Sequence, residues 1–108
     1  MNLLRDLPDA RSAEITEALV ARPGLRIECI TSFGQASPAG FWYDQDEAEW
    51  VLLVAGAARL RFEDEAEARQ LGPGDWVEIA PHRRHRIEWS DPAQPTVWLA
   101  VFYRQEAE

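Results

Sequence analysis

Short apolar runs separated by turn residues divide most of this chain, and this pattern limits the folds that it can adopt. The run 49–55 is almost continuously apolar and stops at Gly56. The next run, 58–63, alternates apolar and charged residues, as a half-buried strand does. About seven short strands with turn signals between them are typical of a β-sandwich or β-barrel. The strands that we expect are 25–29, 49–55, 58–63, 76–79, 85–89 and 97–103.

One stretch has helical rather than strand periodicity. Across 12–21, apolar residues recur at the spacing of one helix face, and Ser12 is a suitable N-cap. Pro23 and Gly24 follow, as they do at many helix ends. We therefore expect an N-terminal segment, 1–24, with one short helix, followed by a barrel over 25–108.

Composition restricts the partners that the chain can have. Its 108 residues fit a single domain, and a net charge of −8 argues against nucleic-acid binding. The sequence has no lysine, which excludes Schiff-base chemistry by lysine. Cys29 is the only cysteine, so no internal disulfide can form. Because it lies in a strand-like run, we expect a buried, inert thiol. No apolar run is long enough to span a bilayer and the N-terminus lacks signal-peptide features, so we expect a cytoplasmic protein without a membrane partner.

The residues around the run 49–55 can be aligned with a known motif, Gly-x5-His-x-His-x3–4-Glu-x6-Gly, which they match only in part. Glu49 and Gly56 fill its last two positions. Tyr43 and Gln45 stand where the pattern has its two histidines, and Ser37 stands at the leading glycine.

A second segment, 74–89, can be aligned with a second known motif, Gly-x5-Pro-x-Gly-x2-His-x3-Asn. Gly74 and His85 match it. Ala80 stands at the proline position, His82 at the second glycine and Trp89 at the asparagine.

These two motifs, in this order, resemble those of the cupin superfamily of small barrels, over roughly 25–103. The run 42–47 also resembles a subgroup of short, single-domain cupins that lack the histidine pair. The resemblance implies an all-β, cupin-type jelly-roll β-barrel, here with one short N-terminal helix. Cupins typically bind a divalent metal ion through three histidines and a glutamate. The resemblance therefore implies a metal ion of unknown identity, for which the ligands available here are Gln45, Glu49 and His85.

Strand alternation predicts which side chains meet inside such a barrel. Residues of one parity share a face, so Tyr43, Gln45 and Glu49 are expected on one side of their segment. His85 and Trp89 are expected to share a face of theirs. We predict that these five residues line a ligand-binding pocket.

Other charged residues have plainer interpretations. His82 is expected in a turn or at the rim of the pocket, because Pro81 precedes it. The cluster Arg83, Arg84 and Arg86 is expected to pair with surface carboxylates. The acidic stretch 63–67 is expected to form a solvated hairpin tip rather than a cation site.

The even-numbered side of the run 49–55, with Trp50, Leu52 and Val54, is also apolar. A strand that is apolar on both faces needs a cover, either the N-terminal helix or a second subunit. Since cupins of this size are commonly dimers, we expect a homodimer.

Two classes of function remain open at this point. One is a small cupin that binds a divalent metal, a small polar metabolite or both, with catalysis unproven; an isomerase, lyase or dioxygenase would fall here. The alternative is a metal-free module for ligand binding or structural dimerisation. The sequence specifies neither a reaction nor a substrate.

Overall fold

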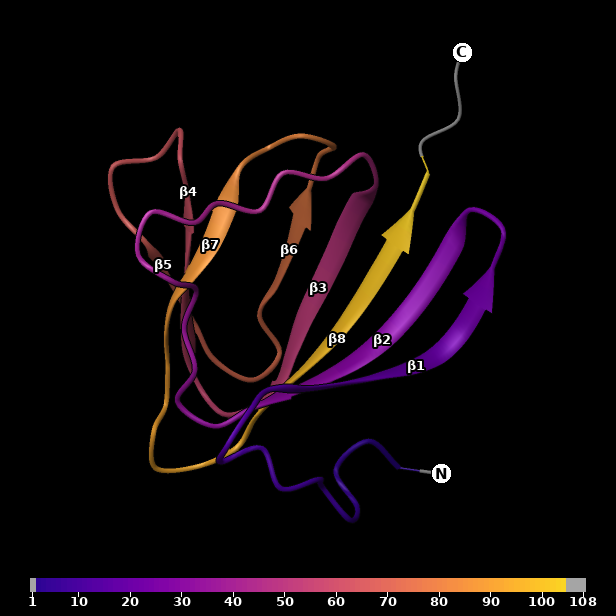
Figure 1. The fold of residues 1–108 in the computed structure, drawn as a ribbon, viewed down its shortest axis with the longest axis vertical. Coiled ribbons are helices and arrows are strands. Elements are labelled where there is room, and N and C mark those ends of the chain that lie inside the picture. Colours follow the sequence, from indigo (N-terminus) through magenta and orange to yellow (C-terminus); the bar gives the residue numbers. More distant parts are fainter. Residues whose placement is uncertain (1, 105–108) are drawn as a thin grey trace.

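The computed structural model describes residues 2–104, which form eight β-strands and no helix (Figure 1). All strand pairs are antiparallel. One sheet has five strands in the order β1-β2-β8-β3-β6, and the other has three in the order β5-β4-β7. The strands are β1 Ile15–Arg22, β2 Leu25–Ser32, β3 Ala48–Ala55, β4 Ala58–Phe62, β5 Arg69–Leu71, β6 Trp76–Ile79, β7 His85–Ser90 and β8 Thr96–Tyr103.

The two sheets enclose one hydrophobic core, to which both contribute. Leu53 from the larger sheet and Leu60 and Phe62 from the smaller one are almost completely buried. This two-layer arrangement confirms the predicted all-β, jelly-roll class, and all six of the predicted strands form. None of the described residues forms a helix of the length and apolarity that crossing a membrane requires.

Strand β3 follows the predicted alternation closely. Glu49, Val51 and Leu53 are buried in the barrel, at 9%, 5% and 0% exposure, whereas Trp50 and Leu52 are only half-buried on the outer face. The register with β8 and β6 therefore fixes Glu49 inside the barrel.

The predicted N-terminal helix is wrong, because residues Ile15–Arg22 form strand β1 at the edge of the larger sheet. Arg22 pairs with Leu25, so Pro23 and Gly24 form a tight hairpin turn rather than a helix end. Gly24 has a φ of 76°, which suits the third position of a Pro-Gly turn. Cross-strand hydrogen bonds to β2 override the local helical pattern, and a register shift in β1 accommodates its irregular apolar spacing.

Gly56, which ends β3, has a packing role as well as a conformational one. Its φ is 92°, a region that favours glycine, and a Cβ here would lie 2.5 Å from Thr96 Oγ1 and 2.6 Å from the Pro95 carbonyl oxygen. The turn between β3 and β4 therefore packs directly against the start of β8.

The buried free thiol of Cys29 agrees with its predicted inert role. The side chain lies in β2 and is 8% exposed. Burial, with a smaller contribution from Glu17, raises the pKa of this thiol, which disfavours the reactive thiolate.

Truncation of Leu53 tests the core assignment. Leu53→Ala removes a fully buried side chain between the sheets, and we expect the free energy of unfolding to fall by about 2–5 kcal/mol. Leu19→Ala, at a position that is 41% exposed, is the matched control and should change it by no more than about 0.5 kcal/mol. Denaturant unfolding measures both, and equal losses would contradict the burial of Leu53.

Candidate functional site

Strand β7 and the segment that precedes β3 are joined at the mouth of the barrel. Tyr43 and His85 form a two-bond bridge, in which each backbone N–H donates to the other's carbonyl oxygen, at 2.7 and 3.2 Å. Further along, Ser37 N donates to Ile87 O, and Ile87 N donates to Ser37 Oγ. The segment thus lies along the free edge of β7 and brings Tyr43 beside the imidazole, with ring centroids 5.4 Å apart.

Three polar side chains converge inside the barrel, as predicted. Gln45 Nε2 donates to Glu49 Oε1 at 2.9 Å, and His85 Nε2 lies 3.5 Å from the same oxygen. The side chains of His85 and Glu49 are 6% and 11% exposed. Glu49 comes from the start of β3 in the larger sheet and His85 from the start of β7 in the smaller one, so the site bridges the two sheets.

The hydrogen bond made by Nδ1 of His85 determines whether Nε2 carries a proton or a lone pair in the neutral ring. Nδ1 lies 2.9 Å from the Arg83 carbonyl oxygen, which can only accept a hydrogen bond, so Nδ1 carries a proton. In the neutral ring, Nε2 then directs a lone pair at the Glu49 carboxylate. Such a pair of acceptors is stable only with a proton, a ligand donor or a cation between them.

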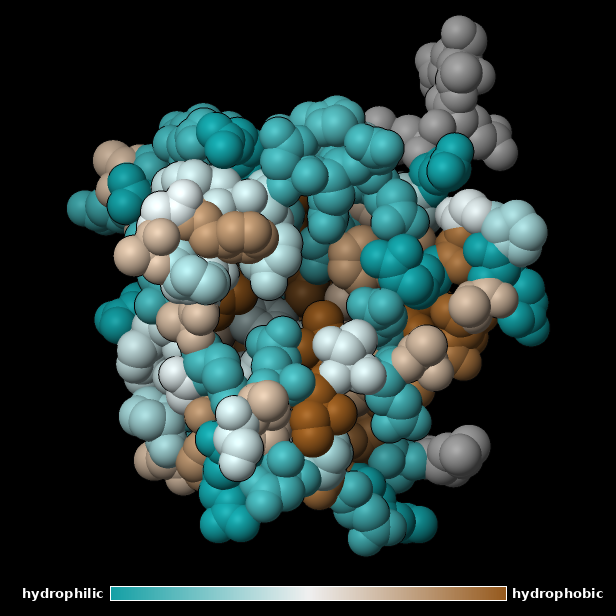
Figure 2. Space-filling view, in the orientation of Figure 1, coloured by the Kyte–Doolittle hydropathy of each residue, from teal (hydrophilic) through white to brown (hydrophobic). Residues whose placement is uncertain are grey.

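The cavity in front of these groups has a volume of about 220 Å³. Its walls are largely apolar. Figure 2 shows a hollow near the centre of the face with hydrophobic residues in and beside it. Glu14, Thr16 and Glu28 lie on the β1–β2 side of the cavity, and no arginine lines it among residues 2–104. The apolar walls are Ile30, Val51, Leu60, Ile79, Ile87, Trp98 and Phe102.

Tyr43 lines this cavity from the rim and is 40% exposed. Desolvation, with smaller contributions from the negative charges of Glu14 and Glu49, raises the pKa of its phenol. The hydroxyl therefore stays protonated at neutral pH and is a hydrogen-bond donor or acceptor rather than a base.

Trp89 does not join the other four predicted ligand-binding residues. A register shift lies where Leu60 pairs with Ile87 and Arg59 pairs with Trp89. The shift interrupts the alternation of β7, and Trp89 packs under the Arg59 guanidinium at 4.8 Å instead of lining the cavity. Sequence analysis did not predict that Glu14, Thr16 and Glu28 line the cavity. Glu14 and Thr16 lie in the segment for which a helix was predicted.

His82 lies in the turn before β7, as expected, with a φ of 61°. Its Nδ1 is 2.7 Å from Asp44 Oδ1, and its backbone N–H donates to the Gln45 carbonyl at 2.8 Å. The hydrogen bond to Asp44 is the main cause of a raised imidazole pKa. These contacts hold the turn against the segment that carries Gln45.

The arginine cluster divides between two kinds of partner. Arg83 pairs with Asp64 and Arg84 with Glu63, which confirms the predicted surface pairing. Arg86 instead donates to the Ser37 and Pro38 carbonyls.

Several solved structures have the same fold as this chain. A protein from Ralstonia eutropha JMP134, provisionally described as a mannose-6-phosphate isomerase, is 47% identical over 97% of both chains, with a TM-score of 0.94. A cupin superfamily protein from Desulfitobacterium hafniense DCB-2 is 17% identical over 87% of this chain and 80% of its own, with a TM-score of 0.72. KdgF from Halomonas sp. is 20% identical over 98% and 94%, with a TM-score of 0.73. No family model and no curated protein matches the chain.

The chain belongs to the cupin superfamily. In this cupin, Glu49 and His85 occupy the motif positions assigned from the sequence and face one another in the barrel. Tyr43 and Gln45, at the positions of the histidine pair, lie beside them.

The donor set of this cupin suits a divalent ion only in part. Ligands at about 2.0–2.2 Å from one ion can be 3.5 Å apart, as His85 Nε2 and Glu49 Oε1 are. Gln45 would add its carbonyl oxygen if the amide were turned over. Within residues 2–104, however, no group of three or more His, Cys, Asp and Glu side chains is placed to hold a metal. These three residues would therefore hold an ion more weakly than a full set of imidazoles and a carboxylate.

Proposed function

We propose that this cupin binds a small metabolite in the barrel, with an apolar body against the walls and a hydroxyl or amine at Glu49. The observation that carries the proposal is the convergence of His85 Nε2 and Gln45 Nε2 on Glu49 Oε1 in the lining of a cavity of about 220 Å³. A ligand donor between Nε2 and the carboxylate would satisfy two acceptors that otherwise face one another. The aromatic ring of Tyr43 at the rim would cover the ligand.

The charge of the cavity favours a neutral or cationic ligand over a phosphorylated one. Glu14, Glu28 and Glu49 all line it, and no arginine does among the described residues. Arg26 neutralises Glu28 at 2.9 Å, but its guanidinium is outside the lining. Proteins recognise phosphate groups with arginine, lysine or backbone N–H groups, so the cavity offers a sugar phosphate no matching charge. We therefore do not transfer the provisional description of the Ralstonia eutropha relative to this chain.

A divalent ion is the second candidate ligand. The favouring observation is again the Nε2 lone pair aimed at Glu49. Gln45, Glu49 and His85 would hold the ion, which would supply a Lewis acid inside the barrel. Either ligand depends on Glu49 and His85, and neither requires that the protein be an enzyme.

Paired ligands test the proposal. We expect small amino alcohols with an apolar chain to raise the thermal midpoint at millimolar concentration, whereas mannose 6-phosphate should not. Glu49→Gln and His85→Ala should each abolish the shift, because the first removes the carboxylate charge and the second removes the imidazole. Glu67→Gln, at an exposed position outside the cavity, is the control and should leave it unchanged.

Calorimetric titration of the same variants with Mn²⁺ or Zn²⁺ tests the ion. Metal binding that is lost in Glu49→Gln would favour the second candidate. Tight binding of mannose 6-phosphate to the wild type would contradict the charge argument. Unchanged binding of every probe in both site variants would remove the barrel site altogether.

The outer face of the larger sheet supports an additional role in assembly. Trp50 pairs with Val101, and Leu52 pairs with Leu99 on one side and Trp76 on the other. Trp76 is 59% exposed and stacks near Trp50, with centroids 5.9 Å apart. Glu78, the β6 partner of Trp50, lies at the border of this apolar cluster. An exposed apolar cluster of this kind is typical of a subunit interface, and we infer that a second copy covers it.

Charge on that face tests the homodimer. We expect sedimentation at tens of micromolar to give a dimer, and Leu52→Glu to give a folded monomer, because it places a carboxylate in the contact. Gln70→Glu adds the same charge on the exposed strand β5 and should remain dimeric. A wild-type monomer would contradict the inference.

A further inference from the structure

We propose that Arg83 is a positioning residue for the barrel site. By anchoring the turn before β7 on the β4–β5 hairpin, it would hold its own carbonyl against Nδ1 of His85 and so fix the tautomer whose Nε2 faces Glu49. The consequence for ligand binding rests on the proposed function, whereas the effect on the imidazole does not.

The link between Arg83 and the site is a single hydrogen bond, from His85 Nδ1 to the Arg83 carbonyl oxygen at 2.9 Å. Imidazole has two neutral tautomers that differ little in intrinsic stability, so the partner of one nitrogen decides which nitrogen carries the proton. If the carbonyl turned away, Nε2 would be free to take the proton and donate to Glu49. The site would then present a closed hydrogen bond instead of an open lone pair.

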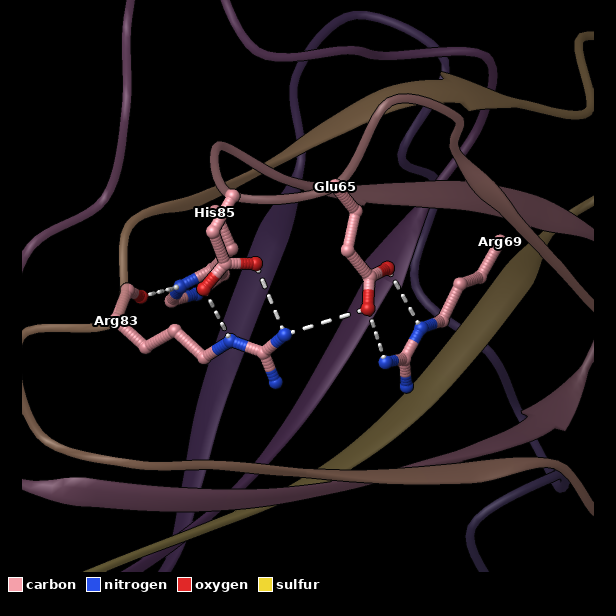
Figure 3. A network of polar contacts seen from close by, with 5 residues as sticks. Glu65, Arg69, Arg83 and His85 are labelled. Carbon is pink, nitrogen blue, oxygen red and sulfur yellow. Dashed lines mark hydrogen bonds and ion pairs between the residues drawn. The ribbon is translucent and has the colours of Figure 1, made fainter.

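The side chain of Arg83 is held by several contacts at once (Figure 3). Its Nε and Nη2 donate to the two carboxylate oxygens of Asp64 at 3.1 and 3.0 Å, and Nη2 also donates to Glu65 at 3.3 Å. The guanidinium carbon lies 3.6 Å from the centroid of the Phe62 ring. Two-point pairing and ring stacking fix the direction of a guanidinium more firmly than a lone surface ion pair does.

The anchor continues into the hairpin. Glu65 also accepts two hydrogen bonds from Arg69, at 3.0 and 2.7 Å, and Arg69 lies over Phe62 at 4.8 Å. Phe62 is fully buried and is the cross-strand partner of His85. The two arginines thus hold the aromatic residue that pairs with His85, and the hairpin tip that the sequence presents as merely solvated is part of the support.

Backbone hydrogen bonds provide the competing explanation. Arg83 N donates to Ala80 O, Glu63 N donates to Arg84 O and His82 N donates to Gln45 O. If these bonds alone fix the turn, removing the Arg83 side chain would leave the carbonyl, and with it the tautomer, unchanged.

Long-range ¹⁵N–¹H spectra of the imidazole rings separate the two explanations without any ligand. In the spectrum of the neutral imidazole, recorded at alkaline pH, wild-type His85 should show a pyrrole-like Nδ1. In Arg83→Ala we expect the Nε2–H tautomer to rise to a comparable population, and Arg83→Lys should restore the wild-type pattern only in part, since lysine cannot pair at two points. Asp64→Asn combined with Glu65→Gln keeps Arg83 but removes its anchors, and should reproduce the Arg83→Ala spectrum.

Arg59→Ala is the control, because Arg59 stacks on Trp89 and belongs to the same sheet without contacting the turn. It should leave the His85 signals unchanged. An Arg83→Ala protein that is folded and has an unaltered His85 tautomer would overturn the proposal. Altered His85 signals together with no probe bound by the wild type would keep the proposal and reject the proposed function instead.

Discussion

A carboxylate and an imidazole that are both buried remain in a folded protein only when each is compensated. Glu49 and His85 are 9% and 4% exposed, in a barrel whose other interior side chains are largely apolar. Glu49 is compensated by the hydrogen bond from Gln45, and His85 by its hydrogen bond to the Arg83 carbonyl. His85 Nε2 and Glu49 Oε1, which lie 3.5 Å apart, need a proton, a ligand donor or a cation between them. Since a buried polar group without a partner costs about 1–3 kcal/mol, the surrounding elements have to bring these groups together. The bridge between Tyr43 and His85, the register of β3 and the turn before β7 all serve this requirement.

The same arrangement explains how an incomplete cupin motif can still build a site. At the two positions where the motif has histidines, Gln45 donates a hydrogen bond to Glu49 and the ring of Tyr43 stacks against His85. Replacing two imidazoles by an amide and a phenol lowers the affinity for a transition metal but keeps a polar centre in an apolar cavity. In our proposal, this exchange shifts the site from metal coordination toward recognition of a ligand by hydrogen bonds.

Strict alternation made much of the fold predictable, and its interruptions explain the errors. Glu49, Val51 and Leu53 were correctly placed inside, because β3 is regular along its inner face. Trp89 was misplaced because a register shift lies in β7, and nothing in the sequence marks it. Strand β5 spans only Arg69–Leu71, too short for any periodicity to identify it.

The N-terminal segment and the Arg83 anchor depended on contacts that local sequence does not contain. Residues 12–21 have helical spacing, yet pairing with β2 decides their conformation, and the Pro-Gly pair is equally suited to a helix end and a hairpin turn. The role of Arg83 had one available signal, the complementary charges of 63–67 and of the arginine cluster. That signal predicted the ion pairs but not that they lie behind His85.

A double-mutant cycle on Glu49 and His85 tests most directly whether these two groups depend on one another inside the barrel. The free energies of unfolding of wild type, Glu49→Ala, His85→Ala and the double variant give their coupling without knowledge of any ligand. The geometry predicts a coupling of about 0.5–3 kcal/mol in magnitude, because the two groups share one contact inside the barrel. Additivity within about 0.3–0.5 kcal/mol would mean that the two groups do not interact, and would contradict the site on which this account rests.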